Sequence, residues 1–118
     1  MLGVRIPLGT AFVEEVVFRG VLLGAFLGEG TVVALIVTSA TFGLWHIAPT
    51  ALLVDANRLR GVVVPAGVVA TGVAGAFLGW LRVETGSIAA PFVLHALVNA
   101  LGGGAAMIAH SLHRRSGG

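Results

Sequence analysis

The chain has 118 residues, of which 57% are hydrophobic and only 10% charged, and its mean hydropathy is +1.01. A soluble domain of this size needs more charged residues to cover its surface, so the composition predicts a membrane protein in contact with a lipid bilayer. Cysteine is absent, which excludes disulfides, thiolate metal sites and a cysteine nucleophile. The net charge of +2 comes from scattered arginines that form no basic stripe, so nucleic-acid binding is not expected.

Four apolar windows follow one another along the chain. A transmembrane helix needs about 20 predominantly apolar residues. The windows lie at residues 7–27, 31–54, 62–81 and 87–109. Short polar segments separate them, which favours antiparallel neighbours. We therefore expect an all-α fold, a polytopic transmembrane bundle of about four spanning helices that forms a single domain over residues 1–118.

The arginines outside these windows are distributed unequally between the two sides of such a bundle. One side carries Arg5, Arg58, Arg60, Arg114 and Arg115, and the opposite side carries only Arg82. By the positive-inside rule, both termini are expected in the cytoplasm. The absence of lysine and the wealth of Ala, Val, Gly and Arg are typical of a GC-rich bacterial genome, so the expected location is a bacterial inner membrane.

The first window carries three ionisable side chains. An ionised side chain at a helix centre costs roughly 2.5–3.5 kcal/mol on insertion scales. Glu15 and Arg19 are four residues apart with the acid first, which is a favourable arrangement for an ion pair on one helix face. Glu14 points about 100° away around the helix. It therefore needs protonation or a hydrated polar pocket, and a carboxyl in that state suits a general base.

Polar residues recur in the second and fourth windows. His46 lies in the second, and His95 and Asn99 lie four residues apart in the fourth. At 1.5 Å per residue from the expected cytoplasmic ends, these three and Glu14 lie roughly 10 to 21 Å deep, so one cavity can include all four. Each alone has a structural interpretation, since an intramembrane His or Asn often bonds a neighbouring helix.

Other residues of the windows are assigned to packing. Phe42 and Trp45 are expected to be packing aromatics. Glycines recur at every fourth position in two places, as Gly20, Gly24 and Gly28 and as Gly75 and Gly79. Such ridges let helices approach closely in lipid, within one chain or in a helix-mediated oligomer.

Three motifs occur in order on these segments. They are EExxxR at Glu14, Glu15 and Arg19, FxxxH at Phe42 and His46, and HxxxN at His95 and Asn99. With them, the chain resembles the CPBP family of intramembrane proteases, also called the CAAX-protease or Abi family, over about residues 8–104. Because members of this family usually have further membrane helices, the resemblance implies that the chain is the catalytic core of a larger family fold.

The resemblance also implies roles for the motif residues. Glu14 would be the general base that activates a water, and His46 would position and polarise that water. His95 and Asn99 would stabilise the oxyanion formed when the peptide carbonyl is attacked. The Glu15–Arg19 pair would hold the first helix in place.

The resemblance leaves the cofactor open. The family is widely labelled a metalloprotease group, in which Glu14, His46 and His95 would hold a zinc ion with an open position. A metal-free glutamate mechanism has also been proposed for it. The chain lacks the compact HExxH zinc motif. Its only aspartate, Asp55, lies in a loop, which excludes an aspartyl dyad.

Three functions are compatible with these residues. The first is an intramembrane endopeptidase that cleaves a peptide or protein substrate near the cytoplasmic face. The second is a non-catalytic membrane scaffold or bacteriocin-immunity protein that retains the fold, although such a protein does not need the unpaired Glu14. The third is a proton or ion pathway, which the apolar outer halves of the windows disfavour.

Overall fold

The computed structural model describes residues 2–54 and 57–116, with side chains described for residues 8–54 and 59–114. Within these ranges every regular element is helical, which confirms the all-α fold. The N-terminal run comprises α1 (Leu2–Glu15), the π-helical η1 (Val16–Leu22), α2 (Leu23–Phe26) and the 3₁₀ turn η2 (Leu27–Glu29). The remaining elements are α3 (Thr31–Trp45), α4 (Ile47–Leu52), α5 (Asn57–Thr85) and α6 (Ala89–Ser116).

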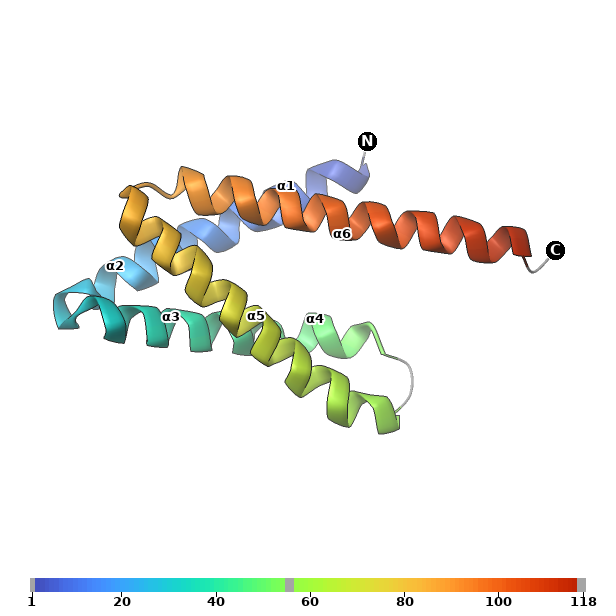
Figure 1. The fold of residues 1–118 in the computed structure, drawn as a ribbon, viewed down its shortest axis with the longest axis horizontal. Helices are drawn as coiled ribbons and strands as arrows, with labels where there is room; N and C mark the ends of the chain where they lie inside the picture. The colour runs from blue at the N-terminus through green and yellow to red at the C-terminus, as the bar shows by residue number, and fades with distance from the viewer. Residues whose placement is uncertain (1, 55–56, 117–118) are drawn as a thin grey trace.

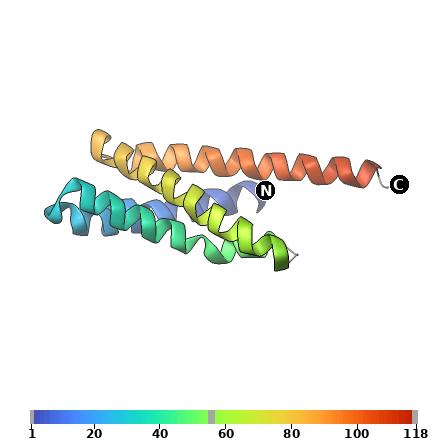
Figure 2. The ribbon, with the colours of Figure 1, turned by 60° about the horizontal axis from the view of Figure 1, so that its bottom comes forward.

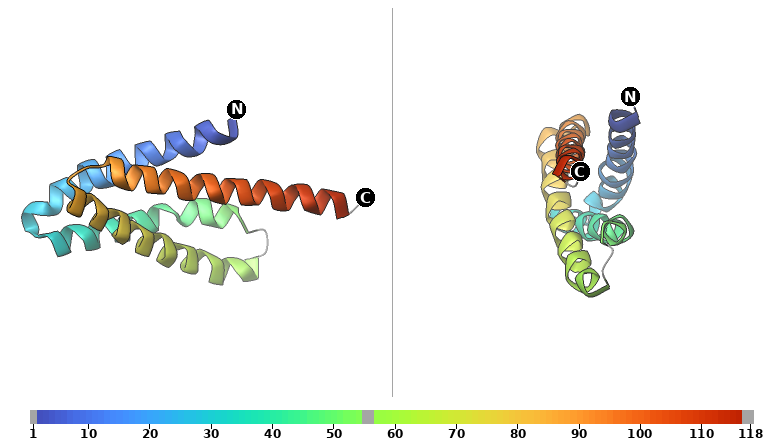
Figure 3. Two further views of the ribbon diagram at one scale, coloured as in Figure 1. Left: turned by 45° about the horizontal axis from the view of Figure 1, so that its top comes forward. Right: turned by 90° about the vertical axis from the view of Figure 1, so that its right-hand side faces the viewer.

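The helices form a flattened bundle that measures 59 × 34 × 17 Å along its principal axes. α1 packs along α6, and α5 packs obliquely on α3, which is the most extensive contact between helices (Figure 1). The start of α1 and the end of α6 lie toward one end of the bundle. The turn between η2 and α3 and the turn between α5 and α6 lie at the other end (Figure 2). Figure 3 shows the same arrangement, with the last turns of α6 extending beyond the other helices.

Glycine and proline set the ends of several helices. Gly30, between η2 and α3, has a φ of +110°, and Gly86, between α5 and α6, has a φ of +67°. Both values favour glycine because a Cβ would clash there. Pro49 has no N–H to donate to the carbonyl of Trp45 and its ring crowds that carbonyl. This explains why α3 ends at Trp45 and why His46, with φ −86° and ψ 4°, separates α3 from α4.

Three helical runs of the described chain are long and apolar enough to cross a membrane, namely 31–52, 59–85 and 89–114. The N-terminal run, expected to be the first of four spans, is not among them, and it carries Glu14, Glu15 and Arg19 in its middle. The helices α5 and α6 extend beyond the windows 62–81 and 87–109, because polar residues continue both helices past their apolar centres.

The glycines make close contacts at only some of the expected positions. A Cβ built on Gly75 would lie 2.9 Å from Phe42, and one on Gly79 would lie 2.8 Å from Leu35, as expected for a close-packed ridge. At Gly24 and Gly28 a Cβ would meet no heavy atom of the described residues within 4 Å. The expectation of a tight ridge is therefore wrong for these two glycines within this chain.

Candidate active site

The site begins where α1 passes into a wider helix. Glu14 and Glu15 close α1, and their exposed fractions are 8% and 0%. In the following segment η1 the bonding changes to the π pattern, in which the N–H of Leu23 bonds the carbonyl of Phe18. Short π segments of this kind often occur at functional sites. Phe18 and Arg19, inside η1, are both buried.

Glu15 is the centre of a buried polar cluster. Its Oε1 accepts a hydrogen bond from Nη1 of Arg19 at 3.0 Å and lies 2.8 Å from Nδ1 of His95. Nη2 of Arg19 donates to the carbonyl of Gly75 at 3.0 Å. The guanidinium carbon also lies 4.3 Å from the ring centroid of Phe42, a cation–π distance. These contacts join the N-terminal run to α3, α5 and α6.

The contact with Glu15 sets the tautomer of His95. A carboxylate only accepts hydrogen bonds, so Nδ1 of His95 carries the proton that faces Glu15. Nε2 is then the nitrogen available for chemistry. It lies 3.5 Å from Oε2 of Glu14. His95, only 7% exposed, is therefore placed between two carboxylates.

Glu14 has partners on two other helices. Its Oε1 accepts a hydrogen bond from Nε1 of Trp45, at the end of α3, at 3.3 Å. Its Oε2 faces His95 on α6. Sequence analysis treated Glu14 as unpaired and Trp45 as a packing residue, so this hydrogen bond was missed. The sequence offered no signal for it, because the approach of α1 to the end of α3 is a tertiary feature.

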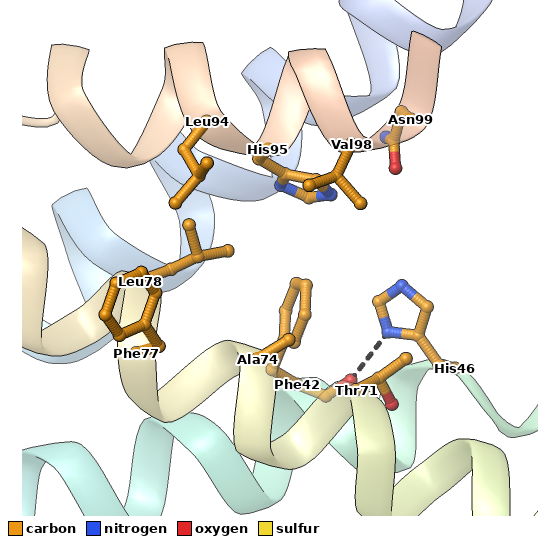
Figure 4. Close-up of a pocket in the computed structure, with 10 residues that line it drawn as sticks. All are labelled: Phe42, His46, Thr71, Ala74, Phe77, Leu78, Leu94, His95, Val98 and Asn99. Carbon is orange, nitrogen blue, oxygen red and sulfur yellow. Dashed lines mark hydrogen bonds between the residues drawn. The ribbon is translucent and has the colours of Figure 1, made fainter. Parts of the chain in front are cut away.

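His46 lies across a cavity from His95 (Figure 4). Its Nδ1 is 2.8 Å from the carbonyl of Phe42, so Nδ1 donates and Nε2 is the free acceptor. The cavity has a volume of about 450 Å³. It is lined by Phe42, His46, Thr71, Ala74, Phe77, Leu78, Leu94, His95, Val98 and Asn99. Three of the four predicted catalytic residues therefore line one cavity whose other walls are mostly apolar.

The fourth predicted residue, Glu14, is connected to this cavity through His95. In the described structure Glu14 does not line the cavity. Its carboxylate contacts His95, and His95 does line it. Asn99 lies on the same helix as His95, one turn further on (Figure 4). Thr71 of α5, which sequence analysis did not select, is the remaining polar residue of the lining.

The predicted zinc ligands do not form a compact donor set. Among the described residues, no three His, Cys, Asp or Glu side chains are grouped closely enough to hold a metal ion. Glu14 and His95 are in contact, whereas His46 lies on the opposite wall of the cavity (Figure 4). The residues present therefore do not fit a three-ligand zinc centre of Glu14, His46 and His95.

Comparison with known families matches residues 1–101 to the type II CAAX prenyl endopeptidase Rce1-like family. The chain belongs to this family. The match confirms the resemblance to CAAX proteases that the three motifs indicated. Comparisons with curated proteins and with solved structures give no match. Membership of the Rce1-like family, together with the apolar helices, identifies a membrane protein of the CAAX-protease type.

Proposed function

We propose that this chain is an intramembrane endopeptidase that hydrolyses a peptide bond with a water activated by Glu14. The observation that carries the proposal is the contact between Oε2 of Glu14 and Nε2 of His95 at 3.5 Å. The carboxylate from α1 thus contacts an imidazole of α6 that lines a cavity together with His46 and Asn99. A carboxylate and an imidazole in contact are able to accept and pass on the proton of a water.

The roles of the four residues follow from the side-chain atoms that are not engaged in the hydrogen bonds described above. Glu14 takes a proton from the water, and the unprotonated Nε2 of His46 orients that water from the opposite wall. His95, with its Nδ1 proton held by Glu15, donates from Nε2 only after it receives a proton from Glu14. The resulting imidazolium and the amide of Asn99 then face the oxyanion. When the oxyanion collapses and the C–N bond breaks, the imidazolium returns its proton to the leaving amine. Removing one such donor typically costs about 10²–10³ in kcat.

The proposed mechanism uses no metal, since the donor set is not grouped for one. Dialysis against a chelator is expected to leave the cleavage rate unchanged. A loss of activity that added zinc restores would contradict this part of the proposal.

The lining of the cavity supports a peptide substrate with apolar side chains near the cleaved bond. Six of its ten lining residues are Phe, Leu, Val or Ala. Burial of one such side chain contributes about 1.5–3 kcal/mol, which is enough to select apolar residues over polar ones. We also propose that the protein lies in a bacterial inner membrane, which rests on the lysine-free composition rich in Ala, Val, Gly and Arg. The arginine distribution supports a cytoplasmic position for both termini.

The test is cleavage of a set of apolar peptides by the purified protein in detergent. Glu14→Gln is expected to lower kcat by about 10³ or more, since it removes the base. Glu29→Gln changes an exposed carboxylate of η2 and should cleave as the wild type does. Wild-type activity in Glu14→Gln would contradict the proposal. It would favour a scaffold or immunity protein, which needs the fold but not the base.

A further inference from the structure

We infer that Trp45 is a positioning residue for Glu14, because its indole N–H fixes one carboxylate oxygen while the other faces His95. The kinetic part of this inference rests on the proposed function. The contact itself does not, and it can be measured without any substrate.

The contact joins a largely exposed side chain to a buried one. Nε1 of Trp45 lies 3.3 Å from Oε1 of Glu14, whose exposed fraction is 8%. Trp45 is 61% exposed, and its ring packs edge to face on Phe18 at 6.1 Å. The polar edge of the indole is thus directed toward the carboxylate, while much of the ring faces the surroundings of the bundle.

The end of α3 explains how the adjacent residues Trp45 and His46 face different parts of the site. Pro49 prevents α3 from continuing through His46. The side chain of Trp45, the last residue of α3, reaches Glu14 on α1. His46, outside the helical geometry, lines the cavity between α3, α5 and α6 instead.

An indole N–H is suited to this position because the surroundings are apolar. A carboxylate out of water needs donors, and a Trp N–H out of water needs an acceptor, so each satisfies the other. A bond to Oε1 leaves Oε2 free for His95 and for a water. Without it, the Glu14 side chain can rotate away from His95, so a smaller fraction of the protein has the reactive geometry.

This role differs from packing in its effect on kinetics. In the described structure Trp45 does not line the cavity, so its substitution should not change substrate binding there. Trp45→Phe keeps an aromatic ring against Phe18 and removes the five-membered ring of the indole that carries the N–H. We expect kcat to fall about 10- to 100-fold, as for loss of one hydrogen bond to a charged group, with KM within about twofold of the wild type.

A matched control is available on α5. Trp80 is 45% exposed and packs on Phe77, and no contact joins it to Glu14 in the part of the chain described. Trp80→Phe removes the same N–H from the same residue type, and both kcat and KM should remain at wild-type values. If Trp45→Phe also keeps the wild-type kcat in an active protein, the inference is wrong.

Fluorescence tests the contact directly, because Trp45 and Trp80 are the two tryptophans of the chain. In the Trp80→Phe protein, emission reports on Trp45 alone. Glu14→Ala in that background should change the intensity and the emission maximum, whereas Glu29→Ala should change neither. Unchanged emission with Glu14→Ala would overturn the inference.

The two experiments separate the possible failures. If the wild type cleaves no peptide, the proposed function fails, and the emission result alone decides whether Trp45 holds Glu14. If the wild type is active, the kcat of Trp45→Phe and the emission of Trp45 must both change for the inference to stand.

Discussion

His95 and Glu15 are 80 residues apart in the chain, yet Nδ1 of the imidazole lies 2.8 Å from Oε1 of the carboxylate. The same oxygen accepts the hydrogen bond of Arg19. One atom therefore orients a proposed catalytic imidazole and compensates a buried cation. Among the described residues, Oε2 of Glu15 and Nε of Arg19 are buried without a hydrogen-bond partner. The cluster therefore has few other hydrogen bonds to compensate for the loss of one member.

Replacing the Glu15 carboxylate should destabilise the fold. Glu15→Gln leaves the guanidinium of Arg19, which is fully buried, without the carboxylate to which it is directly bonded. Removing one partner of a buried ion pair typically costs about 3–5 kcal/mol. Thermal unfolding in detergent, followed by circular dichroism, should show a clear decrease in midpoint. Glu29→Gln, on the surface, serves as control, and an equal midpoint in the two variants would contradict the assignment.

Arg19 is predicted to be irreplaceable by lysine. The guanidinium donates to Glu15 and to the carbonyl of Gly75 from separate nitrogens, and its plane lies near the ring of Phe42. A lysine ammonium is a compact charge that cannot reproduce this fork. Arg19→Lys should lower the free energy of unfolding by about 1.5–3 kcal/mol, the value of one charge-assisted hydrogen bond.

Chemical unfolding in detergent measures that difference. Arg114→Lys is a suitable control, because Arg114 is exposed and its bond goes to His110 one turn away on the same helix. Equal unfolding free energies for the two variants would show that the two-nitrogen contact of Arg19 with Glu15 and Gly75 does not stabilise the fold.

The sequence was sufficient for relationships within one helix. The spacing of Glu15 and Arg19 predicted their ion pair, and the structure contains it. The apolar windows predicted helices, and the motifs predicted the family. The placement of His46, His95 and Asn99 around one cavity agrees with the estimate of their depths, which required only the helix rise.

Relationships between helices could not be predicted in this way. The depth of a residue does not specify the rotation of its helix, so Glu15 and Glu14 were equally plausible partners for Nδ1 of His95. The contact of the Trp45 indole with Glu14 could not be predicted either. Trp45 and His46 are adjacent at the end of α3, yet Trp45 contacts Glu14 and His46 lines the cavity. The glycine spacing predicted a close helix contact at Gly24, which the structure lacks, and did not include Gly43, where two helices do approach closely. Spacing alone does not show which face of a helix packs against another helix.

The contact between α3 and α5 should be sensitive to one methyl group at Gly43. A Cβ there would lie 2.6 Å from the carbonyl oxygen of Val68 and 3.2 Å from the backbone of Gly72, neither of which is a flexible side chain. Gly43→Ala should therefore force the helices apart and cost about 1–3 kcal/mol. Because Gly43 lies between Phe42 and His46, cleavage activity should fall as well.

Gly24→Ala is the matched control for this substitution. A Cβ on Gly24 meets no described atom within 4 Å, and Ala is the better helix former by about 0.8–1 kcal/mol. The control should unfold at the same temperature as the wild type or slightly higher. If Gly43→Ala behaves like Gly24→Ala, the close packing of α3 on α5 is wrong.

The two histidines should separate activity from stability. His46 is partly buried, and among the described residues its one hydrogen bond joins it to the nearby carbonyl of Phe42, so His46→Ala removes little from the fold. His95 is buried against both Glu14 and Glu15, so His95→Ala also removes a hydrogen bond to a charged group. We expect both variants to lose about 10²–10⁴ in kcat, since each removes an imidazole that handles the water or its proton. Only His95→Ala should also lose about 1.5–3 kcal/mol of unfolding free energy.

Unfolding and cleavage measured on the same detergent preparations decide between these roles. If His46→Ala unfolds as early as His95→Ala, then His46 supports the fold in a way that its single local bond does not explain. If His95→Ala keeps the wild-type kcat, the imidazole between the two carboxylates is structural. In that case the proton of the water must leave Glu14 by another route, for which His46 across the cavity is the remaining described imidazole in the lining.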